Sequence, residues 1–110
     1  MSTIWVDIGG IGATLQHVIR AVVLSAAARK ELRKCPQHVV RKLMGWVGEV
    51  QTVGLEVARR NPGYHDELLK GKWSGHRSIR LSRSYRAIYV IQDDGSVEFA
   101  LVERVSKHEY

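Results

Sequence analysis

The sequence predicts an α+β fold around one hydrophobic core: a strand, an α-helical hairpin, and then an antiparallel β-meander whose single sheet packs on the helices. Three observations predict it. The length of 110 residues is that of one domain. Between Ser25 and Ala58 the apolar residues recur every three or four positions, which is typical of amphipathic helices. After Gly63 they alternate with polar residues, which is typical of half-buried strands.

The first strand and the helical hairpin are expected within residues 19–57. Ile19–Leu24 is rich in β-branched residues and is expected to form the strand. Ser25 can cap the helix that follows, and Pro36 ends that helix and begins the next. The buried face of the second, longer helix is expected to comprise Val40, Leu43, Trp46, Val47, Val50, Val53 and Val57. Three glycines weaken this helix, namely Gly45, Gly48 and Gly54.

The meander begins after the turn Asn61-Pro62-Gly63, in which Gly63 is expected to supply the positive φ of a type II turn. Three strands are expected beyond it, at His76–Ser82, Tyr85–Ile91 and Val97–Val105. The stretch Asp93-Asp94-Gly95-Ser96 favours a hairpin turn between the last two strands.

Burial decides the register that we expect between the first two strands of the meander. A two-residue turn would pair Arg80 with Ala87 and would mix Arg86 into the core face. An odd-numbered loop that pairs Arg80 with Ile88 avoids this. The residues then expected on the buried face are Ile79, Leu81, Ala87, Tyr89 and Ile91. The open face would carry Arg80 and Arg86 together with Ser78 and Ser82.

Residues 1–17 are expected to be a loosely structured N-terminal extension to a folded domain at 18–110. They are nearly uncharged and contain a glycine cluster, with a short strand expected at Ile4–Ile8. The cluster lacks the spacing of a dinucleotide-binding fingerprint. The apolar stretch 21–28 is far shorter than the ~20 residues of a membrane span, so no membrane association is expected.

Cysteine and histidine usage argues against bound metals and disulfides. Cys35 is the single cysteine, so an internal disulfide and a multi-cysteine zinc site are both excluded. The five histidines show no paired ligand spacing. We therefore expect no metal and no other cofactor, in a protein that folds by packing in the reducing cytoplasm.

The positive charge is concentrated in one window. The chain has a formal net charge of +6, and the window 68–92 contains no acidic residue. Its six cations are Lys70, Lys72, Arg77, Arg80, Arg83 and Arg86. A focused basic region indicates a polyanionic partner, and nucleic acid is the first expectation; a solvated strand face is the alternative. Aromatic residues interleave with the cations, and Trp73 among them could stack on a base.

The stretch 67–89 resembles the signature of RelE/ParE-superfamily toxins. The resemblance rests on Lys70-Gly71, on the spaced arginines Arg80 and Arg86, and on the closing Tyr89. The ending Val105-Ser-Lys-His-Glu-Tyr110 is similar to the C-terminal His/Tyr motif of the RelE, YoeB and HigB branches. The resemblance covers about residues 19–110 and implies a RelE-like fold.

The resemblance also implies a function. It implies the toxin of a type II toxin–antitoxin system, an endoribonuclease that cleaves ribosome-bound mRNA without a metal. The implied partners are a cognate antitoxin, in a hetero-oligomeric complex, together with mRNA and the ribosome. Two other functions stay open: a ParE-like inhibitor of DNA gyrase with the same fold and no nuclease activity, and a basic RNA-binding module without catalysis.

Individual site residues are implied where this sequence matches the family pattern. The catalytic residues implied are Glu67, Arg80, Arg86, His108 and Tyr110. The RNA-binding residues expected are Lys70, Lys72, Arg77 and Trp73. The sequence departs from the pattern in two places: Leu68 stands where the family has proline, and Glu109 separates the histidine from the tyrosine that close relatives of YoeB have side by side.

These residue types match the chemistry of RNA cleavage without a metal. Such cleavage needs a base for the 2′-hydroxyl, an acid for the leaving 5′-oxygen and fixed cations for the charge on the phosphate. Glu67 or Tyr110 could be the base, and His108 is the natural acid because imidazole titrates near neutrality. Arg80 and Arg86 can bind phosphate oxygens in a fork.

Overall fold

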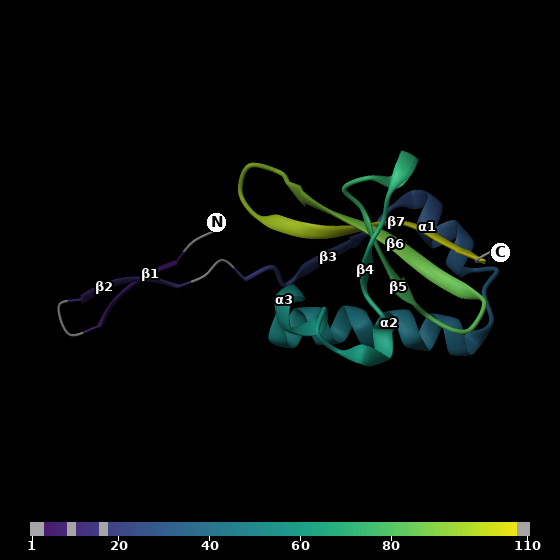
Figure 1. The fold of residues 1–110 in the computed structure, drawn as a ribbon, viewed down its shortest axis with the longest axis horizontal. Coiled ribbons are helices and arrows are strands. Elements are labelled where there is room, and N and C mark those ends of the chain that lie inside the picture. Colours follow the sequence, from purple (N-terminus) through teal and green to yellow (C-terminus); the bar gives the residue numbers. More distant parts are fainter. Residues whose placement is uncertain (1–3, 9–10, 16–17, 108–110) are drawn as a thin grey trace.

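The computed structural model describes residues 4–8, 11–15 and 18–107, and it confirms the α+β fold. A mixed five-stranded sheet has the strand order β3-β7-β6-β5-β4. Its strands are β3 (Ala21–Leu24), β4 (Glu67–Leu68), β5 (Arg77–Arg80), β6 (Tyr85–Asp93) and β7 (Glu98–Lys107). β3 runs parallel to β7 and the other neighbours are antiparallel. The helices lie against the sheet (Figure 1) and share one core cluster with it.

Helix α1 (Ala26–Leu32) is hydrogen-bonded to β7 at both ends. At its start the hydroxyl of Ser25 accepts a hydrogen bond from the N–H of Ala28 at 3.0 Å, which confirms the predicted cap, and donates to the carbonyl of Glu103 at 2.8 Å. At its end the Glu31 carboxylate accepts from Arg104 Nη2 at 2.6 Å and from the Val105 N–H at 2.8 Å. These bonds fix the helix along β7.

The second helix is interrupted, which corrects the prediction of one helix through Val57. Helix α2 (Gln37–Val53) ends at Gly54, which has φ +90°, and α3 (Leu55–Ala58) follows. The positive φ changes the helical phase, so the face that meets the core changes too. The residues buried are Val39, Leu43, Trp46, Val47, Val50, Leu55 and Ala58. Val53 and Val57 were expected in the core and are 40% and 48% exposed, while Val40 is half-buried.

The turn after α3 differs from the expected type. Pro62–Tyr64 forms one turn of 3₁₀ helix, η1, in which the Asn61 side chain accepts from the Gly63 N–H at 2.9 Å. A turn capped in this way does not require a positive φ at Gly63. The left-handed residue is instead His65, with φ +48°.

The meander has the predicted strand order and a register shifted by two residues. Arg80 pairs with Arg86, and not with Ile88 as expected. A tight loop causes the shift, because the Ser82 hydroxyl accepts from the Tyr85 N–H at 3.1 Å and the Tyr85 carbonyl accepts from Leu81 and Ser82. A shift of two keeps every side chain on its face. The predicted burial of Ile79, Leu81, Ala87 and Tyr89 is therefore confirmed.

The prediction that Ile91 lies on the core face of β6 is wrong. Ile91 is 40% exposed. The β6–β7 ladder is shifted between Ile88 and Tyr89, and Ile91 lies beyond this irregularity, toward the hairpin turn. The turn itself is as predicted: Gly95 has φ +94°. Backbone N–H groups of Val97 and Ser96 donate to the Asp94 carboxylate and lower its pKa to about 2.

The N-terminal strands form a sheet of their own. β1 (Ile4–Ile8), which was predicted, and β2 (Ile11–Leu15), which was not, pair antiparallel as a two-stranded hairpin. Figure 1 shows this hairpin standing apart from the five-stranded sheet. No helix within the described ranges is both long and apolar enough to cross a bilayer.

Candidate functional site

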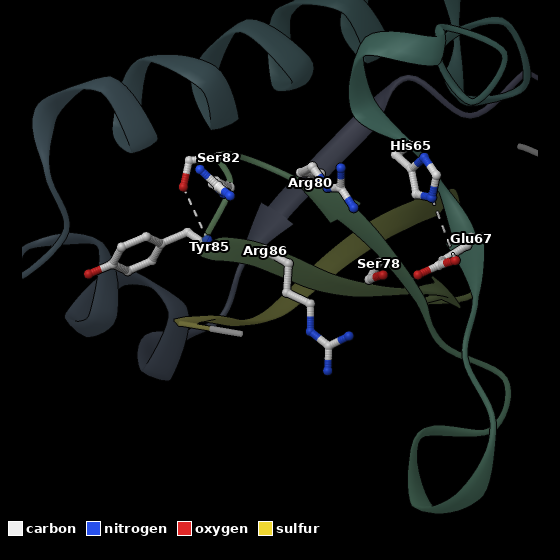
Figure 2. Close-up of a pocket in the computed structure, with 8 residues that line it drawn as sticks. His65, Glu67, Ser78, Arg80, Ser82, Tyr85 and Arg86 are labelled. Atoms are coloured by element: carbon white, nitrogen blue, oxygen red, sulfur yellow. Dashed lines mark hydrogen bonds and ion pairs between the residues drawn. The ribbon is translucent and has the colours of Figure 1, made fainter. Parts of the chain in front are cut away.

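A pocket open to solvent lies on the open face of the sheet, between β4 and the start of β6. It is lined by His65, Glu67, Ser78, Arg80, Ser82, Arg83, Tyr85 and Arg86. Figure 2 shows Arg80 directed toward His65 and Glu67, and Arg86 extending across the same face of the sheet. The pocket brings together three of the five residues implied to be catalytic: Glu67, Arg80 and Arg86.

The two arginines lie opposite each other, with no neutralising partner in the part of the chain that the structure describes. Arg80 on β5 pairs in register with Arg86 on β6, and like charges placed directly opposite destabilise a sheet. Among the described residues, neither guanidinium has an ion pair or a hydrogen bond. The Nε of Arg86 is buried and lacks a hydrogen-bond acceptor. Guanidinium groups that lack a partner among the described residues suit an anion with several oxygens, such as a phosphate.

Glu67 reaches the pocket from the opposite side. It lies on the short edge strand β4, where it pairs with Ser78 of β5. Its Oε2 lies 3.9 Å from Nε2 of His65, which is too long for a hydrogen bond. Both side chains are more than half exposed, at 57% and 59%. A carboxylate and an imidazole, both exposed to solvent, therefore lie at the same pocket as the two arginines.

A buried carboxylate fixes the strand that carries Glu67. The side chain of Asp66 is fully buried, and it accepts hydrogen bonds from Arg77 Nε and from the Tyr89 hydroxyl, each at 2.5 Å. Burial and the bond to Asp66 raise the pKa of Tyr89. Burial works against the charge of Arg77, but the bond to Asp66 prevails and raises the pKa of that guanidinium. The residues before and after Asp66 are thereby held at the pocket.

The expected RNA-binding residues lie outside this pocket. Arg77 is on the helix side of β5, in the ion pair with Asp66. Lys70 and Lys72 are exposed in the connection between β4 and β5, which includes the 3₁₀ turn η2 (Gly71–Trp73). The Trp73 ring packs edge-on against His76, with 5.1 Å between ring centroids. None of the four residues therefore lines the pocket.

His108 and Tyr110 lie outside the described residues. The described chain nevertheless reaches the pocket at its C-terminal end. Lys107 pairs with Tyr85 and Ser106 pairs with Arg86, and both Tyr85 and Arg86 line the pocket. The roles of the histidine and the tyrosine stay a prediction.

Sequence reasoning did not include His65, Asp66 or Ser78 among the site residues. Ser78 was placed on the open face by alternation, but nothing in the local pattern indicates that β4 exists and pairs beside it. His65 enters the pocket because of its left-handed backbone, and a single histidine after a turn gives no signal of that. The buried environment of Asp66 comes from Tyr89, 23 positions away in the chain.

The fold is shared with known toxins. No family model and no curated protein matches the chain. Among solved structures, it is similar to the YoeB/ParE toxin from Agrobacterium tumefaciens, with a TM-score of 0.58 and 19% identity over 81% of this chain and 99% of that one. It is similar to YafQ from E. coli strain BL21(DE3), with a TM-score of 0.55 and 18% identity over 81% and 93% of the two chains.

A third similar structure comes from the E. coli DinJ-YafQ toxin-antitoxin complex, with a TM-score of 0.53 and 22% identity over 82% of this chain and 94% of that one. At such identities these likenesses show the fold. They confirm the RelE-like fold that was expected from the sequence.

Proposed function

We propose that this protein is the toxin of a type II toxin–antitoxin system and that it cleaves ribosome-bound mRNA without a metal. One observation carries the proposal: Arg80 and Arg86 lie on one sheet face with no ion pair to any described residue, and the Glu67 carboxylate lines the same pocket. A pair of unpaired guanidinium groups suits a phosphate, and a nearby carboxylate suits a proton acceptor. The likeness in fold to the YoeB/ParE and YafQ toxins supports the assignment.

The proposed reaction is an internal transfer of the phosphoryl group. Glu67 accepts the proton of the 2′-hydroxyl, and that oxygen forms a bond to the adjacent phosphorus as the bond to the 5′-oxygen breaks. Arg80 and Arg86 donate hydrogen bonds to the two non-bridging oxygens, on which negative charge builds. The products are a 2′,3′-cyclic phosphate and a 5′-hydroxyl, and the leaving oxygen takes a proton from an acid. The sequence prediction for this acid is His108.

The exposed cations of the β4–β5 connection serve substrate binding in this proposal. Lys70 and Lys72 would meet neighbouring phosphates, and Trp73 would stack on a base. Binding through phosphates should weaken as salt increases, because condensed counterions are released from the RNA.

A cognate antitoxin is part of the proposal. Two of the similar structures are described as the DinJ-YafQ and YoeB-YefM complexes. In this chain the window 68–92 is free of acidic residues, so an acidic segment of the antitoxin that folds on binding would be attracted to it.

Controlled expression followed by primer extension on cellular mRNA tests the proposal. The wild-type protein should arrest growth and produce cuts at defined codons, whereas Arg86→Ala should produce none. Arg41→Ala is the matched control, since it removes an exposed arginine of α2 outside the pocket. Growth arrest by wild type with intact mRNA would contradict the proposal.

An inhibitor of DNA gyrase is the second candidate. The similar structure from Agrobacterium tumefaciens is described as a YoeB/ParE toxin, and the fold alone does not separate the two branches. An SOS response without mRNA cuts would support this alternative.

A further inference from the structure

We propose that His65 is the general acid of the reaction, the group that protonates the leaving 5′-oxygen. This inference rests on the proposed function and adds to it a residue that the sequence did not indicate. It follows from the position of His65 in the pocket, from its backbone conformation and from the chemistry that the other lining residues lack.

The imidazole occupies the position that a second proton-transfer group requires. His65 lines the same pocket as Glu67, Arg80 and Arg86, and Figure 2 shows its ring turned toward Glu67. Nε2 of His65 and Oε2 of Glu67 are 3.9 Å apart. That separation leaves both atoms without a mutual hydrogen bond. Both side chains are more than half exposed, so they can move apart to the two sides of a bound phosphorus, as a base and an acid must in this reaction.

The backbone of His65 is held in a conformation that a histidine does not adopt freely. Its φ of +48° lies in the left-handed region, which costs an L-residue with a Cβ roughly 1–2 kcal/mol. The His65 N–H donates to the Pro62 carbonyl at 3.3 Å. Tyr64, the residue before it, is buried beneath Lys42, whose Nζ lies 4.6 Å from the ring centre. Strain that the surroundings enforce in this way is concentrated at functional sites.

The residue on the other side is fixed as well. Asp66 is buried and bonded to Arg77 and Tyr89, so the chain cannot rotate freely about His65. The strained conformation therefore aims the imidazole into the pocket by means of two anchored neighbours. Such preorganisation reduces the reorganisation that proton transfer needs.

The other lining groups are poorly suited to donate this proton. Arginines keep their protons at neutral pH, and serine and tyrosine hydroxyls are weak acids. Imidazole is the side chain that titrates near neutrality. The charged and titratable groups lining the pocket with it are Glu67 from β4, Arg80 from β5, Tyr85 and Arg86 from β6, and Arg83 from the loop between these strands.

The proton balance of the step is complete. Glu67 takes the proton of the 2′-hydroxyl, the 2′-oxygen–phosphorus bond forms, and the phosphorus–5′-oxygen bond breaks. The imidazolium of His65 gives its proton to the departing oxygen and becomes neutral. Exchange with water then returns a proton to His65 and removes one from Glu67, so both groups are ready for the next turnover.

A substrate that needs no acid gives the sharpest test. We would measure cleavage of ribosome-bound mRNA in which sulfur replaces the 5′-bridging oxygen at the mapped cut, because a thiolate leaves without protonation. The variant is His65→Asn, since asparagine tolerates the left-handed region. On ordinary mRNA it should lose on the order of 10²-fold or more in rate, the range of a general acid. On the sulfur-containing mRNA it should cleave as fast as wild type.

Four further variants make each outcome decisive. Glu67→Gln should be slow on both substrates, because the base is still needed, and His38→Asn, an exposed histidine of α2, should resemble wild type on both. A His65→Asn protein that is fully active on ordinary mRNA while Arg86→Ala is inactive would overturn the role of His65 alone. Rescue by sulfur in His108→Asn and not in His65→Asn would also overturn it. No cleavage by wild type would overturn the proposed function itself.

Discussion

Arg86 combines two features that are costly for folding: a charge directly opposite Arg80, and a buried Nε without an acceptor. Neither contributes to stability, so both are explained most simply by an anion that binds there. Arg86→Ala should therefore leave the free energy of unfolding unchanged or raise it by up to about 1 kcal/mol. It should lower the cleavage rate on the order of 10²–10³-fold, the effect of losing one donor to a developing oxyanion. Urea denaturation and a cleavage assay on the same preparation check both.

Asp66 has the opposite role, because it stabilises the structure and does not touch the pocket. Asp66→Ala leaves the Tyr89 hydroxyl and the Arg77 guanidinium without their buried partner. The free energy of unfolding in urea should fall by about 3–5 kcal/mol, as expected when one member of a buried pair is removed. Glu56→Ala is the control, because its ion pair with Arg59 is exposed and should be worth less than about 1 kcal/mol. Equal effects of the two substitutions would contradict this account of Asp66.

At the scale of elements, Gly54 sets the geometry of the helical layer. A Cβ at this position would lie 2.6 Å from Cγ1 of Val18, and φ is +90°. Gly54→Ala should therefore destabilise the protein by about 1–3 kcal/mol, the cost of a strained backbone. Gly48 is the matched control within α2, where a Cβ meets nothing within 4 Å. Gly48→Ala should stabilise by about 1 kcal/mol through helix propensity. Thermal unfolding that shifts in the same direction for both would refute the role of Gly54.

The contact between α1 and β7 makes stability depend on pH. The hydrogen bond from Arg104, together with the Val105 N–H, lowers the pKa of Glu31 in the folded state below its usual 4.5. A lowered carboxyl pKa stabilises the fold above the unfolded-state pKa, and this contribution disappears as pH falls through the folded-state value. At neutral pH, Glu31→Gln should thus be less stable than wild type by about 1–2 kcal/mol. The difference should shrink below pH 4.5, as urea midpoints across the acid range would show. A difference that stays constant with pH would contradict this cause.

Local patterns predicted the elements that local chemistry determines. The Ser25 cap, the break at Pro36 and the Asp93–Ser96 turn each depend on residues close in sequence, and each is found. The alternation of apolar and polar residues also predicted which side chains of β5 and β6 share a face. The break at Gly54 did not, because it depends on how Leu55 meets the backbone of Ile19, far away in the chain.

The site was predictable only in part, for the same reason. Arg80 and Arg86 were predicted to share an open face because strand periodicity fixes it. The two-residue strand β4 was missed, since nothing about Glu67 and Leu68 shows that they pair with β5. The position of the His65 side chain depends on a backbone angle, and that of the Arg77 side chain depends on Asp66, eleven positions away. Such features arise only when distant segments meet.

At the scale of the whole molecule, the N-terminal hairpin and the five-stranded sheet form separate hydrogen-bonded units. Isolated two-stranded hairpins are marginally stable in water, so β1 and β2 should contribute little to the stability of the sheet. A protein that lacks residues 1–17 should keep the thermal midpoint and the activity of the full chain. A large loss of either would show that this segment packs on the domain.

The proposed function depends on one pocket, in which residues of β4, β5 and β6 would bind and cleave a phosphodiester. The most direct measurement is the chemistry of the RNA ends produced when purified protein acts on mRNA bound to ribosomes. Internal transfer of the phosphoryl group predicts 2′,3′-cyclic phosphates and 5′-hydroxyl ends with wild type, and neither with Arg80→Ala or Arg86→Ala. Intact mRNA with wild type, or identical ends with the arginine variants, would contradict the assignment of this pocket.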